Sequence, residues 1–327
     1  MGAGRNRIVE VNMRVAIAIP NHNQHYLVRN TVAALARQTV RPSVVYVLSD
    51  GKPYWNLPGE YYPFKVIPIN NLGSRVGRCA NRNSVVRNFM YSDCDSIIFM
   101  DGDCSPMTVD FIERYIELLS NHDLIFGTRE HSDITGLENP PSDILTANMD
   151  NMWAGKDIDY TDLRVVAGAV KAWNEAKTFS ERLDLMLTGM IGWSCNFAFT
   201  KRGLQELTKF QKNTYGMEEG IFDSDAFKDG WGYEDVAMGI DALYAGLDIA
   251  VTDSVKVLHQ AHDRSDGLFD HVKGRHIIME RYRGLQKAVD LKDRIYRVAL
   301  VASAFFTGGL ITGMVTGTIN LLQMLGM

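Results

Sequence analysis

The order of short apolar segments constrains the fold of this chain more than any other feature of its sequence. Val15–Pro20, Val44–Leu48 and Ile97–Met100 have strand length and are almost entirely apolar, as expected of strands buried on both faces of a parallel sheet. Helical spacing follows the first segment, at Tyr26–Gln38, and precedes the last, at Arg78–Met90. This alternation predicts an α/β fold with a mostly parallel central sheet covered by helices on both faces.

Polar residues stand where these apolar segments end. Asn21 follows the first segment and Asp50 the second, while Asn71 follows a further predicted strand at Phe64–Ile69 and Asp101 follows Met100. Ligands of such sheets bind beyond the carboxyl ends of the strands. We therefore expect a binding site at this edge of the sheet.

Two carboxylates separated by one glycine, Asp101 and Asp103, mark one of these strand ends. Alternate side chains of an extended segment point to the same side, and Gly102 allows a ligand to approach the backbone closely. Paired carboxylates suit Mg²⁺ or Mn²⁺, which share their coordination shell with water and substrate phosphates. Because Asp-Gly is also common in turns, a surface turn is the alternative interpretation.

A second acidic pair, Glu234 and Asp235, follows Trp231 and precedes a predicted helix at Val236–Ala245. Negative charge is favourable at a helix start, so helix capping is one interpretation of the pair. Trp231 favours another, because an aromatic face beside a carboxylate can hold a sugar ring and its hydroxyl groups. The pair is therefore a candidate for acceptor binding and catalysis.

Two histidines follow the predicted strand at Val255–Leu258. His259 ends this strand and His262 stands close behind it. Imidazole is a common metal ligand, and a structural histidine is the alternative. His259 is the candidate third ligand beside the two aspartates, with His262 as the second choice.

Composition narrows the classes of partner. The 327 residues carry a formal net charge of −5, so no global basic field draws the chain to nucleic acid.

The four cysteines have no zinc or C-x-x-C spacing and indicate reduced thiols in a cytosolic environment. Met1–Arg14 lacks the apolar core of a secretory signal. From Thr128 to Asp162 no periodicity is found, which is typical of a binding loop.

The segment Val298–Met327 contains no charged residue and no histidine. Its length suffices for a membrane-spanning helix, and Arg294 and Arg297 before it would place the catalytic domain on the cytoplasmic side. Glycines spaced four apart permit close helix packing; they are Gly309, Gly313 and Gly317. We expect a cytoplasmic protein that either associates with the cytoplasmic face of a membrane or forms a homo-oligomer through this helix.

Taken together, these motifs resemble the metal-dependent glycosyltransferases of the GT-A fold, in particular family 2. The resemblance rests on blocks in the family's order: Val15–Asn23, Leu35–Thr39, Ser49–Gly51, Asn71–Gly73, Ala80–Asn83 and Asp101–Asp103. The later blocks resemble the C-terminal half of chondroitin-polymerase-like and β-1,4-galactosyltransferase-like enzymes: Asn196–Phe199, Trp231–Asp235 and His259. The resemblance implies a Rossmann-like GT-A catalytic domain at residues 13–265. A C-terminal helical extension would follow at 266–327, with the apolar helix at 298–327.

For the donor, the resemblance implies a nucleotide-sugar site. Pro20 and Asn21 would form the floor of the nucleotide pocket, and Asp50 would bond the base. Arg82 would approach the nucleotide or its phosphates, and Asp101 would contact the ribose or the metal. A UDP-sugar is the expected donor, although Ser49-Asp50 stands where many members have two aspartates and leaves the nucleotide open.

For the metal and the acceptor, the resemblance implies the remaining roles. Asp103 would be the more direct ligand of Mn²⁺ or Mg²⁺, with His259 completing the protein ligands. Asp235 would be the catalytic base, Glu234 an acceptor-binding carboxylate and Trp231 the acceptor platform.

The implied activity is a metal-dependent, inverting transfer of a sugar from a nucleotide sugar to an acceptor hydroxyl of a glycan or lipid-linked glycan. One alternative is glycosylation of modified bases in DNA, which the negative net charge and the apolar C-terminal segment disfavour. Another is a catalytically inactive, sugar-binding relative. The joint presence of Asp101, Asp103, Asp235 and His259 argues against inactivity.

Overall fold

The structure is a computed structural model that describes residues 13–52, 62–71, 77–131, 163–187, 191, 195–218, 220–227, 233–260, 274, 276–278 and 280–282. The chain divides into two compact units, Met1–Ile278 and Met279–Met327. All helices and strands below belong to the first unit. Trp231, His262, the region 132–162 and the apolar segment 298–327 lie outside the described residues.

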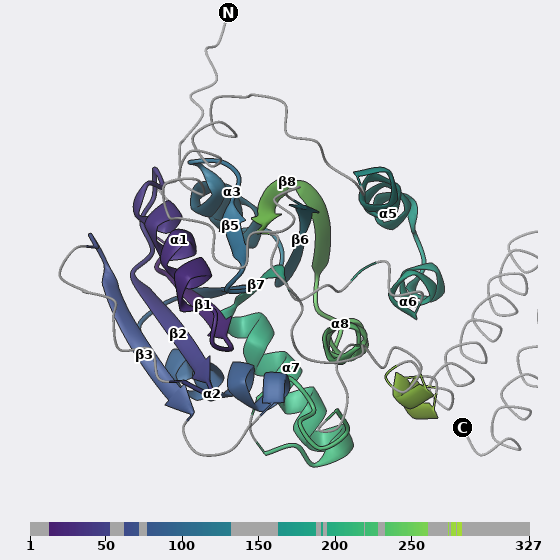
Figure 1. Ribbon diagram of the computed structural model, residues 1–327. Helices are drawn as coiled ribbons and strands as arrows, with labels where there is room; N and C mark the ends of the chain where they lie inside the picture. The colour runs from purple at the N-terminus through teal and green to yellow at the C-terminus, as the bar shows by residue number, and fades with distance from the viewer. Residues whose placement is uncertain are drawn as a thin grey trace, which may run out of the picture. The chain divides into compact units, whose positions relative to one another are not determined.

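One sheet organises the first unit (Figure 1). In the part of the chain that the structure describes, it has eight strands in the order β3-β2-β1-β4-β7-β6-β8-β5. Their bounds are β1 Val15–Asn21, β2 Val44–Asp50, β3 Lys65–Asn71, β4 Ser96–Met100, β5 Cys104–Pro106, β6 Leu124–His131, β7 Asn196–Thr200 and β8 Ile249–His259. The β3–β2, β2–β1, β1–β4 and β6–β8 pairs are parallel, and the pairs of β7 with β4 and β6 and of β5 with β8 are antiparallel. The expected α/β fold with a mostly parallel sheet is confirmed.

Helices cover both faces of the sheet. Their bounds are α1 His25–Ala36, α2 Gly77–Tyr91, α3 Phe111–Leu119, α5 Leu163–Glu175, α6 Phe179–Leu187, α7 Lys201–Tyr215 and α8 Glu234–Tyr244. Figure 1 shows α1 and α3 on one face and α2 and α7 on the other. The helix α2 packs against β1, β2 and β3, and α7 packs against β7 and α8. This arrangement brings α2 and α8, which are distant in sequence, to the same face.

Alternation along the strands builds a core on each side of the sheet. Ile17 and Ile19 of β1 pack with α1 and α3 in one apolar cluster. On the other side, Phe99 of β4 stacks on Phe197 of β7 with ring centroids 4.8 Å apart, and Phe222 packs edge-on against both. Because successive side chains point to opposite faces, a nearly continuous apolar strand contributes to both cores.

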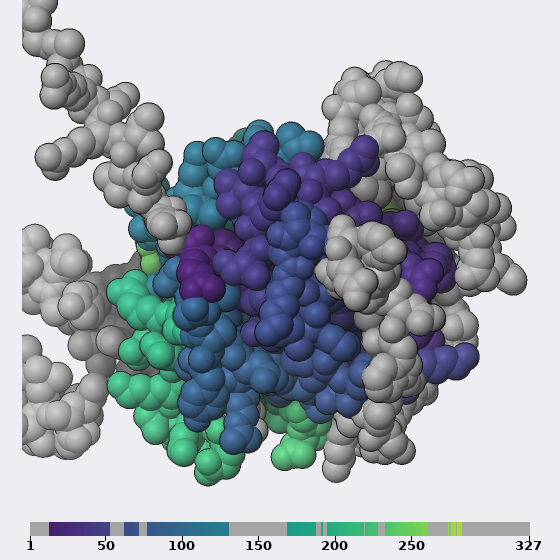
Figure 2. Space-filling model, turned by 90° about the vertical axis from the view of Figure 1, so that its left-hand side faces the viewer, coloured from purple at the N-terminus to yellow at the C-terminus, as the bar shows by residue number. Residues whose placement is uncertain are grey.

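The strand β3 forms one edge of the sheet. None of its seven residues is buried, and Figure 2 shows the face of the molecule that carries this edge. At its end the Asn71 side chain donates a hydrogen bond of 2.7 Å to Asn81 Oδ1 of α2. The bond ties the edge strand to the helix that follows it.

The structure corrects two sequence-based predictions around the central sheet. The sequence of Leu163–Leu187 has helical periodicity along its whole length, but it forms two helices, because Thr178 and Glu181 form a capping box at the start of the second. The irregular region predicted from Thr128 begins later, because β6 continues through His131 in pairing with β8. Cross-strand pairing overrides the weak local pattern there.

A buried asparagine holds the register shift between β6 and β8. Asn196 Nδ2 donates to the carbonyls of Thr128, at 3.2 Å, and Val255, at 3.0 Å, and Tyr115 Oη donates to Asn196 Oδ1 at 2.6 Å. A side chain at Gly127 would place its Cβ 2.5 Å from the Val255 carbonyl oxygen. With this shift β8 runs as one strand from Ile249 to His259, whereas the sequence pattern predicts two short strands, at Ile249–Val251 and Val255–His259.

A search of the described residues for membrane-spanning helices found none that is long and apolar enough.

Candidate active site

The polar residues at the strand ends meet at one edge of the sheet, as predicted. Asn21 pairs with Ser49 across β1 and β2, and Asp50 pairs with Asn71 across β2 and β3. Asp101 directly follows β4, which pairs in parallel with β1. The carboxyl ends of four neighbouring strands thus supply polar groups to a common site.

The Asp-Gly-Asp segment is a turn held in the interior. Gly102 is buried, and a Cβ added to it would lie 2.8 Å from the Pro20 carbonyl oxygen and 3.0 Å from Val28 Cγ2. Thr31 Oγ1 lies 3.2 Å from the Gly102 carbonyl oxygen and 2.8 Å from that of Cys104. The glycine therefore permits the turn to pack against the end of β1, which fixes the two aspartates beside Pro20.

Asp103 and His259 face each other across the β5–β8 pairing. Asp103 Oδ2 lies 3.5 Å from His259 Nε2, and each side chain is 15% exposed. The Gln260 backbone donates to the Asp103 carbonyl oxygen at 2.7 Å, which fixes the loop next to the pair. Both side chains are thus held together and remain accessible to a ligand.

This pair has the right chemistry for a divalent cation. Carboxylate and imidazole are both ligands of Mn²⁺, and neighbouring ligands of an octahedral ion with bonds of about 2.1 Å lie about 3 Å apart. Among the described residues no group of three or more His, Cys, Asp or Glu side chains converges on one metal position. Asp103 and His259 fit such an ion as two protein ligands that leave positions for water and phosphate oxygens.

Arg82 joins two parts of the site that are distant in sequence. Its Nη2 donates to Asp101 Oδ1 at 2.8 Å and its Nη1 to Glu234 Oε1 at 3.1 Å. Burial lowers the pKa of Arg82, but the charges of Asp101 and Glu234 outweigh it and raise that pKa overall. The predicted donor-site arginine is thus placed between the end of β4 and the start of α8.

The second acidic pair begins α8, as predicted. Glu234 is the first residue of the helix and is 3% exposed. Asp235 Oδ1 accepts a hydrogen bond from the backbone of Val236 at 2.9 Å. Tyr233 before them has a φ of 68°, which is unfavourable for a residue with a side chain. Backbone strain of this kind concentrates at functional sites.

A buried thiol shows which carboxylates share one neighbourhood. The pKa of Cys195 is raised to about 12, chiefly by burial; the nearby charge of Arg129 lowers it, and those of Asp101, Asp103 and Asp235 add to the rise. These carboxylates come from the end of β4, the turn after it and the start of α8. Three of the predicted acidic residues therefore lie within electrostatic reach of the Cys195 thiol.

Arg129 of β6 is a further charged residue of the site that the sequence pattern does not predict. Burial lowers its pKa, but the nearby acidic groups of Cys195, Cys104, Asp101 and Asp103 outweigh burial and raise it. Arg129 thus lies within electrostatic reach of both aspartates of the Asp-Gly-Asp turn. It falls in the region predicted to be irregular, and no local signal distinguishes it.

The loops after β1 and β2 are joined at the predicted nucleotide side. Asp50 is buried, and its Oδ2 lies 3.9 Å from His22 Nδ1. Asn23 has a φ of 58°, and its Oδ1 accepts from the backbone of Lys52 at 3.0 Å. These contacts hold Asp50 beside the loop that contains Asn21.

The strand ends of this sheet carry an acidic turn, and a further acidic pair lies at the start of the neighbouring helix. The fold and the site thus place the chain in the class of GT-A nucleotide-sugar folds. Sequence comparison specifies the family. The sequence model described as glycosyl transferase family 2 matches residues 16–208, more than half of the chain. The chain belongs to glycosyl transferase family 2.

Solved structures with a similar fold include Staphylococcus aureus TarS 1–349, with a TM-score of 0.48 and 12% identity over 76% of this chain and 60% of that chain. Another is TarS 1–349 in complex with UDP-GlcNAc, with a TM-score of 0.48 and 11% identity over 78% of this chain and 60% of that chain. A third is the mannosyltransferase PcManGT from Pyrobaculum calidifontis in complex with GDP-Man and Mn²⁺, with a TM-score of 0.46 and 14% identity over 95% of this chain and 80% of that chain. The match thus spans 60% of the TarS 1–349 chain. No curated protein sequence matches this chain significantly.

Proposed function

We propose that this chain transfers a sugar from a nucleotide sugar to an acceptor hydroxyl of a glycan or lipid-linked glycan, with inversion at the anomeric carbon and with the help of a divalent cation. The observation that carries the proposal is the buried link through Arg82 from Asp101 to Glu234, the neighbour of Asp235 at the start of α8, with His259 facing Asp103. A metal-binding pair and a separate carboxylate at one sheet edge suit a displacement at a sugar carbon next to a diphosphate.

The donor side uses the strand ends. Pro20 and Asn21 would form the floor of the nucleotide pocket, and Asp50 would accept from the base. Asp103 and His259, with Asp101 at the ion or the ribose, would hold Mn²⁺ or Mg²⁺, which supplies charge neutralisation for the leaving diphosphate. A UDP-sugar is the first candidate donor, and the nucleotide depends on the loops around Asp50.

The acceptor side uses the start of α8. Asp235 would take the proton of the acceptor hydroxyl while its oxygen forms the bond to the anomeric carbon and the bond to the leaving phosphate oxygen breaks. General-base assistance of this kind contributes about 10²–10⁴-fold to the rate. Glu234 and Trp231 would bind and orient the acceptor.

We also propose that residues 13–265 form the catalytic domain and that the extension at 266–327 places it, through the apolar segment 298–327, at a membrane face or in a homo-oligomer. Deletion of 298–327 tests this role. Loss of membrane sedimentation or of oligomerisation is expected, and an unchanged distribution of the truncated protein in both assays would contradict it.

The donor is tested by thermal-shift measurements with a panel of nucleotide sugars in the presence of Mn²⁺. We expect one nucleotide class to raise Tm, and the raised Tm to require the metal. Asp103→Ala should abolish the metal-dependent rise, and unchanged donor affinity with Mn²⁺ would refute the assignment of Asp103.

The base is tested by Asp235→Asn with the donor so identified. Transfer should fall by about 10²–10⁴-fold while donor affinity stays unchanged. Asp248→Asn is the matched control, because the Asp248 side chain is 58% exposed and contacts His122 away from the site. Equal loss of transfer and donor binding in Asp235→Asn would indicate a structural carboxylate instead.

A further inference from the structure

We infer that Arg82 is a positioning residue, which fixes Asp101 and Glu234 relative to each other instead of binding the donor phosphates. The inference rests on the proposed function and deepens it. It concerns how the donor side of the site, at the end of β4, is held in place relative to the acceptor side at the start of α8.

The guanidinium of Arg82 is committed to two carboxylates. Its two terminal nitrogens reach Asp101 Oδ1 at 2.8 Å and Glu234 Oε1 at 3.1 Å. The Arg82 side chain is 1% exposed, compared with 3% for Glu234 and 19% for Asp101. Because the side chain is almost fully enclosed, a phosphate could reach this guanidinium only if a neighbouring group moved away, and removing a partner from a buried ion pair is strongly unfavourable.

Neighbouring residues of α2 support this arrangement. The Arg82 guanidinium lies over the ring of Phe222, 5.3 Å from its centroid. The next residue, Asn83, accepts at Oδ1 from the backbones of Ile221 and Phe222 at 2.9 and 3.0 Å and donates to the Phe222 carbonyl oxygen at 2.7 Å. Asn83 thus fixes the ring on which Arg82 rests, so that α2 positions both the arginine and its support.

The shape of the side chain explains why arginine occupies this position. Its planar fork holds two donors at a fixed separation, whereas a lysine ammonium is a single point charge on a flexible chain. With arginine, Asp101 and the first turn of α8 are held as one unit, and that turn carries Asp235. Because a displacement of about 1 Å can cost about 10²-fold in rate, a loosened link between these elements is expected to slow the chemical step.

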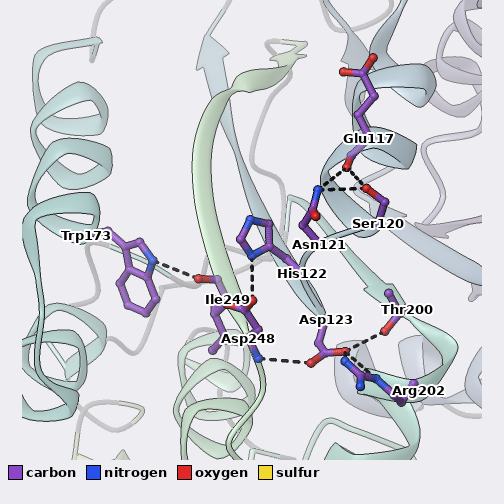
Figure 3. Close-up of polar contacts among 10 residues, drawn as sticks. All are labelled: Glu117, Ser120, Asn121, His122, Asp123, Trp173, Thr200, Arg202, Asp248 and Ile249. Atoms are coloured by element: carbon purple, nitrogen blue, oxygen red, sulfur yellow. Dashed lines mark hydrogen bonds and ion pairs between the residues drawn. The ribbon is translucent and has the colours of Figure 1, made fainter. Parts of the chain in front are cut away.

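The chain offers a matched arginine–carboxylate pair at the opposite end of the strands (Figure 3). Arg202 Nη2 donates to Asp123 Oδ1 at 2.7 Å, a bond similar in length to that between Arg82 and Asp101. The Arg202 side chain is 78% exposed, and its Nε and Nη2 both donate to Asp123 Oδ1. Arg202→Lys therefore makes the same chemical change without touching the proposed site.

The experiment compares Arg82→Lys with Arg202→Lys in the full chain, with the donor and acceptor that the wild type uses. We expect kcat of Arg82→Lys to fall by about 10²-fold. Donor Kd should stay within about threefold of the wild type, because the variant keeps the contacts that bind the donor equally in the ground state and the transition state. Arg202→Lys should leave both unchanged. A donor Kd weakened by about tenfold or more with kcat retained would identify a phosphate ligand and overturn the inference, as would unchanged kcat in Arg82→Lys.

A second measurement does not depend on transfer or on the folding of Arg82→Lys. The variants Asp101→Asn, Glu234→Gln and their combination are compared by thermal unfolding. Either single change leaves Arg82 bonded to one of its two carboxylates, whereas the double change removes both. We expect the Tm loss of the double variant to exceed the sum of the single losses, and additive losses would overturn the link.

The two measurements separate failure of the inference from failure of the proposed function. A wild type that transfers sugar from no nucleotide sugar in the panel refutes the proposed function. An active wild type with an unimpaired Arg82→Lys variant refutes the positioning role alone.

Discussion

Two arginine–carboxylate clusters stand at opposite ends of the strands, and they differ in burial and in what they connect. At the carboxyl end, Arg82 is fully enclosed and joins Asp101 to Glu234, residues that belong to β4's end and to α8. At the amino end, Asp123 lies before β6 and accepts hydrogen bonds from Thr200, Arg202 and the Asp248 backbone (Figure 3). The first cluster is centred on a buried cation, and the second on an anion with an exposed cation.

The amino-end cluster has the properties of a structural anchor. Asp123 Oδ1 accepts from Thr200 Oγ1 at 3.3 Å and from Arg202 Nη2 at 2.7 Å, and its Oδ2 accepts from the Asp248 backbone at 3.3 Å. Most of this network connects backbone and short side chains of adjacent strands. Ion pairs of similar length therefore contribute differently to stability. Desolvation makes the buried Arg82 pair costly to break, whereas the exposed Arg202 pair contributes little.

The largest expected effect on stability comes from Arg82→Met. It leaves the buried Glu234 without its closest arginine partner, and removal of one member of a buried pair costs about 3–5 kcal/mol. Urea unfolding of the variant measures this loss in the free energy of unfolding. Arg87→Met is the control, because Arg87 is exposed on the same helix and should change stability by about 0.5 kcal/mol or less. Equal losses in the two variants would show that burial does not make the ion pairs of Arg82 costly to break.

An intermediate effect is expected for Asp123→Ala. The change removes the acceptor of the Thr200 hydroxyl and of the Asp248 backbone group, and leaving such groups unsatisfied costs about 1–3 kcal/mol. The same urea titration measures it. Transfer activity with saturating donor should stay at the wild-type value, whereas a lost activity would show that the amino-end cluster also shapes the site.

The smallest effect is expected for Arg202→Ala. Its guanidinium is mostly exposed, so solvent and salt screen the pair with Asp123. We expect a smaller loss of stability than for Asp123→Ala, and we expect high salt to remove that loss. Unfolding measured at low and high NaCl concentration checks this, and a loss that persists in high salt would assign the pair a buried character.

Local patterns were sufficient for most of the elements and for most of the candidate residues. The apolar segment Ile97–Met100 is β4, and the polar residues after such segments share one sheet edge because parallel strands align their carboxyl ends. The break between α5 and α6 was also readable from Thr178 and Glu181, a capping-box spacing that the helical periodicity obscured. The three-residue strand β5 has no such pattern, since its existence depends on pairing with β8.

The link through Arg82 could not be read from the sequence. Its partners lie 19 and 152 positions away, and a lone arginine on a helix has many possible roles. The resemblance directed attention to phosphate binding, whereas the structure shows two carboxylates on its terminal nitrogens. Arg129 was missed for a similar reason, because its proximity to Asp101 and Asp103 arises from the packing of β6 beside the site.

The sequence by itself determined the α/β class, the family and the residue types at the strand ends, because apolar periodicity and short motifs are local properties of a chain. The tertiary structure alone decided which charges meet: Asp103 with His259, and Arg82 with Asp101 and Glu234. Burial and distance set the strength of an electrostatic contact, and both depend on how distant segments pack together.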